Sequence, residues 1–145
     1  MNSNPKIGFM QGRLSPLING RIQAFPWECW KAEFPAAQRI DFHLMEWTLD
    51  QERLYESPLL TEAGQAAIRA LCKDHALSIP SLTGDCFMHA PFWKAQGAQR
   101  FALERDFVEI SKGCAAVGIT LLVVPLVDNG RLEGADQEHA LVRFI

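Results

Sequence analysis

The chain has 145 residues, a length typical of one domain, and its 48% hydrophobic content supplies enough apolar side chains for a normal core. The 10% aromatic and 21% charged residues are ordinary globular values, so the composition excludes a disordered chain. The net charge is −3 at pH 7 and no block of Lys or Arg occurs, which argues against a nucleic-acid binder.

Short apolar runs alternate with helical patterns along the first half of the chain. Ile7–Met10 and Phe42–Trp47 predict two strands, because each run is short, apolar and followed by polar residues. Between them, Trp27–Ile40 repeats apolar residues at helical spacing and predicts a helix. Pro35 falls inside this stretch and predicts a break or a kink there.

The second half continues the same alternation. Thr61–Ala76 predicts a helix with Thr61 as its N-cap, and Leu77–Leu82 predicts the third strand. Gln99–Val117 gives the clearest helical pattern, and Gly118 follows at the position where helices commonly end on glycine. The apolar side of this helix is expected to carry Phe101, Val108, Ile110, Cys114 and Val117.

The fourth run, Ile119–Val127, is apolar at nearly every position, which predicts a strand covered on both faces. A further helix is expected to begin near Asp136. The alternation predicts an α/β domain over residues 1–145, with parallel strands joined by right-handed crossovers. Because the sequence stops at Ile145 inside this last helical pattern, we expect the chain to be part of a larger unit.

Polar residues gather just after the predicted strands, where parallel α/β folds place their ligand sites. We therefore predict a substrate-binding set from four strand ends, made of Gln11, Arg13, Glu46, Trp47, Asp85, His89 and Asp128. The catalytic residues stay unknown at this point, and no His, Cys, Asp or Glu spacing in the chain is typical of a metal site.

The residue types in this set suit a small polar ligand. The guanidinium of Arg13 can hold a carboxylate or phosphate, and the amide of Gln11 can both donate to and accept from a hydroxyl. Glu46 lies at the end of a predicted buried strand, where a carboxylate is either paired or functional. Each has a plainer interpretation: Arg13 as an ion-pair partner, Trp47 as a core residue, and His89 as a structural histidine.

The four cysteines are scattered and form no CxxC pair, and no secretory leader or membrane-spanning run occurs. We expect reduced, mostly buried thiols in a cytoplasmic protein that does not enter the membrane.

Several stretches carry a family resemblance. They read GFMQGRLSP, FPWECWKAEFPAAQ, LMEW, SPLLTEAG and VVPLVD, in this order along essentially the whole chain. Together they resemble the sugar phosphate isomerase/epimerase proteins, which belong to the xylose-isomerase-like TIM barrels. The resemblance implies that the chain is the N-terminal half of such a barrel, with about four of its eight strands. One departure is the turn before the second strand, QRIDFHLMEW, which lacks the glycine usual in the family.

The resemblance also implies a function. Members of this family are metal-dependent and shift or invert a centre beside a sugar carbonyl, and their four ligands to a divalent cation come from strands five to eight. We therefore expect this chain to offer a sugar or sugar phosphate a binding rim, with Gln11, Arg13 and Glu46 as the best matches. We expect it to bind no metal itself and to be inactive alone.

Two alternatives stay open. The chain could be a non-catalytic half-barrel that associates with itself or with a partner through exposed strand edges. It could also be a flavodoxin-like domain that binds a phosphorylated ligand, although GRLSPLING after the first strand is a poor phosphate-binding loop.

Overall fold

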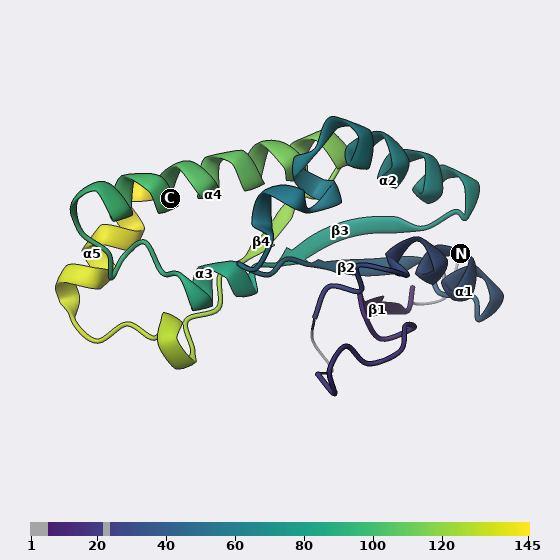
Figure 1. The fold of residues 1–145 in the computed structure, drawn as a ribbon, viewed down its shortest axis with the longest axis horizontal. Helices are drawn as coiled ribbons and strands as arrows, with labels where there is room; N and C mark the ends of the chain where they lie inside the picture. Colours follow the sequence, from purple (N-terminus) through teal and green to yellow (C-terminus); the bar gives the residue numbers. More distant parts are fainter. Residues whose placement is uncertain (1–5, 22–23) are drawn as a thin grey trace, which may run out of the picture.

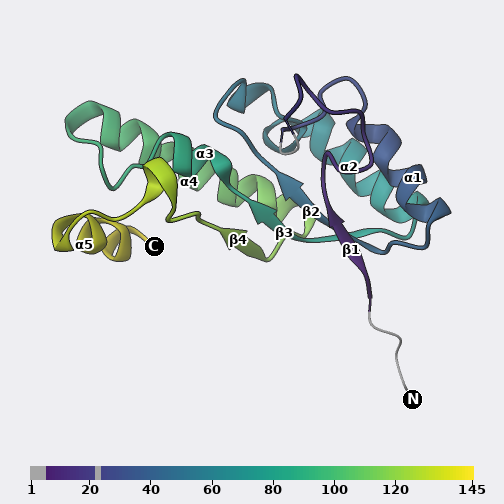
Figure 2. The same ribbon diagram turned by 90° about the horizontal axis from the view of Figure 1, so that it is seen from below.

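A computed structural model describes residues 6–21 and 24–145. The N-terminal residues, on which the expectation of no leader partly rests, lie outside the described part. Within it, four parallel strands form one sheet: β1 (Gly8–Met10), β2 (Leu44–Thr48), β3 (Ser78–Thr83) and β4 (Leu121–Val123). The strand order is β1-β2-β3-β4, so β1 and β4 form the two edges (Figure 2).

The predicted α/β fold with parallel strands is confirmed, and its strand order is consistent with half of a (β/α) barrel. In that architecture each strand lies beside the one that precedes it in the chain. A flavodoxin-like sheet instead places its first strand between the second and the third. The observed order therefore disfavours the flavodoxin-like alternative.

Helices connect and follow the strands. They are α1 (Glu33–Arg39), α2 (Glu62–Asp74), α3 (Asp85–His89), α4 (Gly97–Val117) and α5 (Ala135–Phe144). Short 3₁₀ turns lie at η1 (Trp30–Ala32), η2 (Leu54–Glu56), η3 (Pro58–Leu60) and η4 (Asp128–Gly130). The helices α2 and α4 run along the same face of the sheet (Figure 1). None of the helices in the described ranges has the length and apolar character needed to cross a bilayer.

Strand alternation separates a helix-covered face from an open face. Met45 and Trp47 of β2 are 1% and 0% exposed beneath the helices. Their neighbours Leu44 and Glu46 point to the opposite face and are only partly buried. That open face carries a shallow hollow of about 290 Å³, which residues of β1, β2 and β3 line. The sheet therefore has one face in the core and one face available to a ligand or a partner.

The prediction that the fourth strand is covered on both faces is wrong. The observed β4 is only three residues long, and Leu121 and Val123 are 62% and 43% exposed. These two side chains belong to the open face, because they pair in register with Ser81 and Thr83 of β3. An apolar sequence shows what a strand could bury, but it does not show whether a neighbour covers it.

The predicted helix Trp27–Ile40 is shorter than expected. The α-helix begins only at Glu33, after the 3₁₀ turn η1, so Pro35 lies in its first turn. Backbone N–H groups in a first turn have no partner within the helix, so proline costs nothing there and no kink follows. In the glycine-free turn after α1, Asp41 adopts a left-handed φ of 61° and takes the role that glycine has elsewhere.

The predicted Thr61 cap of α2 and the predicted end of α4 at Gly118 are confirmed, whereas the prediction of the apolar side of α4 is partly wrong. The Thr61 side chain accepts a hydrogen bond from the Gly64 N–H and caps α2, and Gly118 ends α4 with a φ of 88°. However, Phe101 is 72% exposed and Val108 is 42% exposed. The side that packs inward carries Leu103, Phe107, Ile110 and Cys114. The helix has two apolar stripes, and helical spacing alone does not say which one faces the sheet.

Candidate functional site

The segment after β1 is tied to the end of β2. The backbone N–H of Gln11 donates to the Glu46 carbonyl at 2.9 Å, and Gln11 Oε1 accepts from the Thr48 N–H at 3.2 Å. The Thr48 hydroxyl in turn donates to the Gln11 carbonyl at 3.3 Å. Gln11 is fully buried, and its Nε2 has no hydrogen-bond partner among the described residues. The Gln11 side chain therefore supplies a hydrogen-bond acceptor for the last backbone N–H of β2, which explains why an amide residue directly follows β1.

Gly12 follows with a φ of 90°, which L side chains rarely adopt, and its N–H points at the carboxylate of Glu33. The Gly12 N–H lies 2.9 Å from Oε1 and 3.0 Å from Oε2, and the Leu14 N–H lies 3.0 Å from Oε1. Glu33 thus closes the β1–α1 loop from the first residue of α1. Burial raises the pKa of Glu33, and the hydrogen bonds from Gly12, Leu14 and Ser15 oppose this rise.

Glu46 lies in the middle of the open sheet face and is held by β3. Ser81 Oγ donates to one of its oxygens at 2.7 Å, and Thr83 Oγ1 donates to the other at 2.5 Å. Both donors follow from the register, which places Ser81 opposite Glu46 and Thr83 opposite Thr48. The carboxylate is thereby fixed in position while its residue stays only partly buried.

A second hollow of about 460 Å³ lies at the carboxyl ends of the strands, and we call it the strand-end hollow. Its polar lining comes from the loops after β1, β2, β3 and β4 and from the ends of α3. The lining residues are Arg21, Asp50, Thr83, Asp85, Met88, His89, Val123, Pro125, Val127 and Asp128. Polar groups from the segments that follow all four strands meet at this single cavity.

Backbone contacts hold the walls of this hollow together. Asp50 Oδ2 accepts from the Phe25 N–H at 3.2 Å, and the Cys86 N–H donates to the Leu49 carbonyl at 3.0 Å. The Asn129 side-chain amide donates to the carbonyls of Met88 and His89, both at 3.2 Å. This last pair joins the end of α3 to the loop after β4. The hollow is therefore largely formed before any ligand arrives.

The lining is acidic on balance. Three carboxylates, those of Asp50, Asp85 and Asp128, face one guanidinium, that of Arg21, and one imidazole, that of His89. Ionised carboxylates are strong hydrogen-bond acceptors for hydroxyl groups, and an imidazole can donate and accept. The arrangement can therefore orient a ligand that carries several hydroxyls, whereas a phosphate would meet repulsion from the carboxylates.

The donors do not converge on a metal geometry. Within residues 6–21 and 24–145, no three His, Cys, Asp or Glu side chains stand close enough together to hold one ion. The divalent cation stays an expectation for the longer proteins of the resembled family, whose ligands come from later strands.

The structure brings some of the predicted site residues together and separates others. Asp85, His89 and Asp128 line the strand-end hollow, and Glu46 adjoins it through its hydrogen bond with Thr83. Trp47 is 0% exposed on the covered face of β2, among the aromatic rings of the core.

The remaining two predicted residues lie outside the hollow. Gln11 is buried against the end of β2, and Arg13 is exposed on the loop that Glu33 closes.

Sequence reasoning missed three polar residues of the hollow: Arg21, Asp50 and Thr83. Asp50 stands two residues beyond the end of β2, and Thr83 is the last residue of β3, so a search by strand ends could have found both. Arg21 lies near the middle of the long segment between β1 and η1, and no pattern in the sequence points to it.

No protein-family model matches the chain, and a search of curated proteins finds no significant match either. The resemblance to sugar phosphate isomerases therefore rests on the short motifs alone.

Proposed function

We propose that the strand-end hollow binds a sugar, and that the chain provides the substrate-binding part of a sugar or sugar-phosphate isomerase or epimerase of the barrel type. The observation that carries this proposal is the meeting of polar side chains from four consecutive strand ends at one hollow. In (β/α) barrels the loops after the strands form the substrate site.

The chemistry of the lining supports a hydroxyl-rich ligand. Asp85 and Asp50 would accept hydrogen bonds from neighbouring sugar hydroxyls, and His89 could donate to a ring or carbonyl oxygen. Val123 and Pro125 offer an apolar wall for the C–H face of a sugar. Arg21 is the one cation of the described lining and could balance a charged group at the outer end of the ligand. The excess of carboxylates favours a neutral sugar, or the unphosphorylated end of a sugar phosphate.

A titration of the isotope-labelled chain with xylose and with fructose, followed by the backbone amide resonances, tests this proposal. We expect saturable shifts around Asp50, Asp85 and His89, and weaker binding in Asp85→Asn and Asp50→Asn. Asp74→Asn, an exposed change of the same kind at the end of α2, is the matched control and should bind as the wild type does. Shifts confined to another surface, or equal binding by all variants, would overturn the proposal.

We expect binding without turnover from this polypeptide, because the resembled family takes its metal ligands from strands that follow the fourth. Interconversion of xylose and xylulose by the purified chain would contradict this part of the proposal without affecting the location of the sugar site.

A cytoplasmic setting belongs to the proposal. The four cysteines are free, and Cys86 and Cys114 are buried. Burial raises the pKa of Cys114 to about 11 and raises the pKa of Cys86 as well. Such thiols stay protonated and unreactive, as is typical of structural cysteines in a reducing compartment. Loss of folded protein on full reduction would speak against this setting.

The exposed edge of the sheet favours a second candidate function, a half-barrel that pairs with a second copy of itself. On and beyond β4, Leu121, Val123 and Val127 are 62%, 43% and 57% exposed. A two-fold axis parallel to the strands would place β4 of each copy beside β1 of the other, closing a ring with all strands parallel.

Light scattering after size-exclusion chromatography tests this second candidate. The wild type should be a dimer, and Leu121→Lys should dissociate it by placing a charge on the paired edge. Val142→Lys, an equally exposed apolar site on α5, should leave the dimer intact. A wild-type chain that stays monomeric at high concentration would contradict the pairing.

A further inference from the structure

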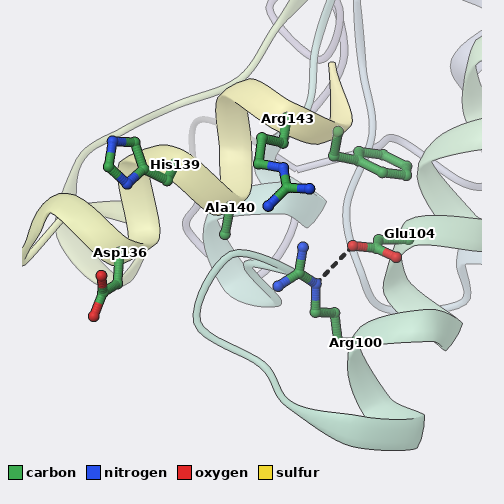
Figure 3. A pocket seen from close by; sticks show the side chains of 7 residues that line it. Arg100, Glu104, Asp136, His139, Ala140 and Arg143 are labelled. Carbon is green, nitrogen blue, oxygen red and sulfur yellow. Dashed lines mark hydrogen bonds and ion pairs between the residues drawn. The ribbon is translucent and has the colours of Figure 1, made fainter.

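A third cavity, of about 580 Å³, lies between α4 and α5, away from the strand-end hollow, and we call it the interhelical groove (Figure 3). The helix α4 contributes one turn of its first half, and α5 contributes the side that faces the groove, most of which is exposed. The lining residues are Arg100, Glu104, Asp136, His139, Ala140, Arg143 and Phe144. The groove shares no residue with the strand-end hollow.

Two guanidinium groups from different helices point into this groove. Figure 3 shows Arg100 of α4 and Arg143 of α5 directed toward the same space, with the backbone of α5 beside them. Like charges brought together in this way repel each other unless an anion lies between them. The residues that line the groove include two carboxylates, so their positions decide whether the arginines are already neutralised.

Only one of these carboxylates pairs with an arginine in the groove. Arg100 Nε donates to Glu104 Oε1 at 2.7 Å, and the side chains are 36% and 17% exposed. A single contact through Nε leaves the outer edge of the Arg100 fork, with its two terminal nitrogens, directed to the groove. Asp136 points away from both guanidinium groups (Figure 3). The space between Arg100 and Arg143 therefore has an excess of positive charge.

Aromatic packing fixes the wall of the groove. The ring of Phe144 lies 4.8 Å from that of Phe92 and 5.4 Å from that of Phe107, measured between centroids. Leu141, one turn before the end of α5, is only 7% exposed. These contacts hold the end of α5 against α4, so the backbone that carries Arg143 lies beside the first half of α4 before any ligand binds.

We propose that the interhelical groove binds the phosphate group of a small phosphorylated molecule, with the phosphate between Arg100 and Arg143. The planar guanidinium fork matches two phosphate oxygens at once, and two forks from opposite sides satisfy a dianion. The rest of the molecule would lie toward Asp136 and His139, which can accept and donate hydrogen bonds to its polar groups. The volume is in the range of small-molecule sites.

Titration of the full chain with inorganic phosphate at constant ionic strength, followed by the arginine side-chain resonances, tests the proposal. We expect saturable shifts for Arg100 and Arg143, and a roughly tenfold to hundredfold loss of affinity in Arg143→Gln, the usual effect of removing one charged hydrogen-bonding group. Arg39→Gln, which removes the same charge from the exposed end of α1, should leave the affinity unchanged.

Glu104→Gln gives an independent test in the opposite direction. This change removes the carboxylate that competes for Arg100, so phosphate should bind more tightly than to the wild type. Most of the lining side chains are at the surface, so the variants should stay folded, and circular dichroism checks that they do. Absence of phosphate binding by the wild type, or equal weakening by Arg39→Gln and Arg143→Gln, would overturn the proposal.

Discussion

Replacement of Glu33 tests how the β1–α1 loop is held. Its fully buried carboxylate accepts from the N–H groups of Gly12 and Leu14, and Gly12 is itself buried. Glu33→Ala leaves both donors without this partner. An unsatisfied buried donor costs about 1–3 kcal/mol, and water can reach Leu14 in part, so we expect a loss of about 2–4 kcal/mol of unfolding free energy.

Glu33→Gln separates the hydrogen bonds from the charge. The glutamine keeps one acceptor oxygen for the two N–H groups and removes a charge that burial disfavours, so we expect a loss of about 1 kcal/mol or less. Urea unfolding, followed by tryptophan fluorescence, measures both variants. The reasoning is refuted if Glu33→Ala unfolds within about 0.5 kcal/mol of the wild type, the range typical of surface changes, or if both variants lose equal stability.

The difference in unfolding free energy between the wild type and Glu33→Gln should change with pH in a definite direction. Burial raises the pKa of Glu33 above 4.5, so the folded chain holds this proton at a pH where the unfolded chain has released it. The contribution of Glu33 to stability is therefore complete below pH 4.5 and decreases as the pH rises through the folded-state pKa. The difference in unfolding free energy between wild type and Glu33→Gln should fall along this interval. A difference that rises or stays constant would contradict the cause assigned to the shift.

Three further changes test the packing. Thr61→Ala removes the N-cap of α2 and should cost about 1 kcal/mol in urea unfolding; no loss would contradict the capping role. Phe34→Ala removes a side chain that is 0% exposed and should cost about 3–5 kcal/mol, whereas Phe101→Ala should change stability by less than about 0.5 kcal/mol. Equal losses of stability in Phe34→Ala and Phe101→Ala would show that Phe101 is on the side of α4 that packs into the core. Cys114 should react with iodoacetamide far more slowly than Cys29, as mass spectrometry of the modified chain can show.

Local signals in the sequence were sufficient for the order of elements and for several of their ends. The Thr61 cap and the Gly118 stop depend on neighbours in the chain and are found where expected, and each of the four apolar runs contains a strand, although the fourth strand is much shorter than its run. The exposure of Leu121 on β4 and of Phe101 on α4 depends on which sides of these two elements other segments cover. That information lies in the packing of distant segments, and apolar residues look the same in both settings.

The candidate site likewise combines residues that local signals in the sequence predict with contacts between distant segments that they do not predict. Asp85, His89 and Asp128 lie in the segments that follow β3 and β4, so strand-end reasoning predicted them and the structure brings them to one hollow. The link between Glu33 and Gly12 joins residues 21 positions apart and leaves no periodic signal. Gln11 was expected at a rim because it follows a strand, yet its side chain turns inward to meet the Thr48 N–H.

The most direct test of the sugar site is a crystal structure of the chain soaked in a concentrated fructose solution. The account predicts sugar density in the strand-end hollow, with hydroxyls within hydrogen-bonding distance of the Asp50 and Asp85 carboxylates, on a sheet of four parallel strands. An ordered sugar bound elsewhere while the hollow holds only water, or strand ends that open toward opposite sides of the sheet, would contradict it.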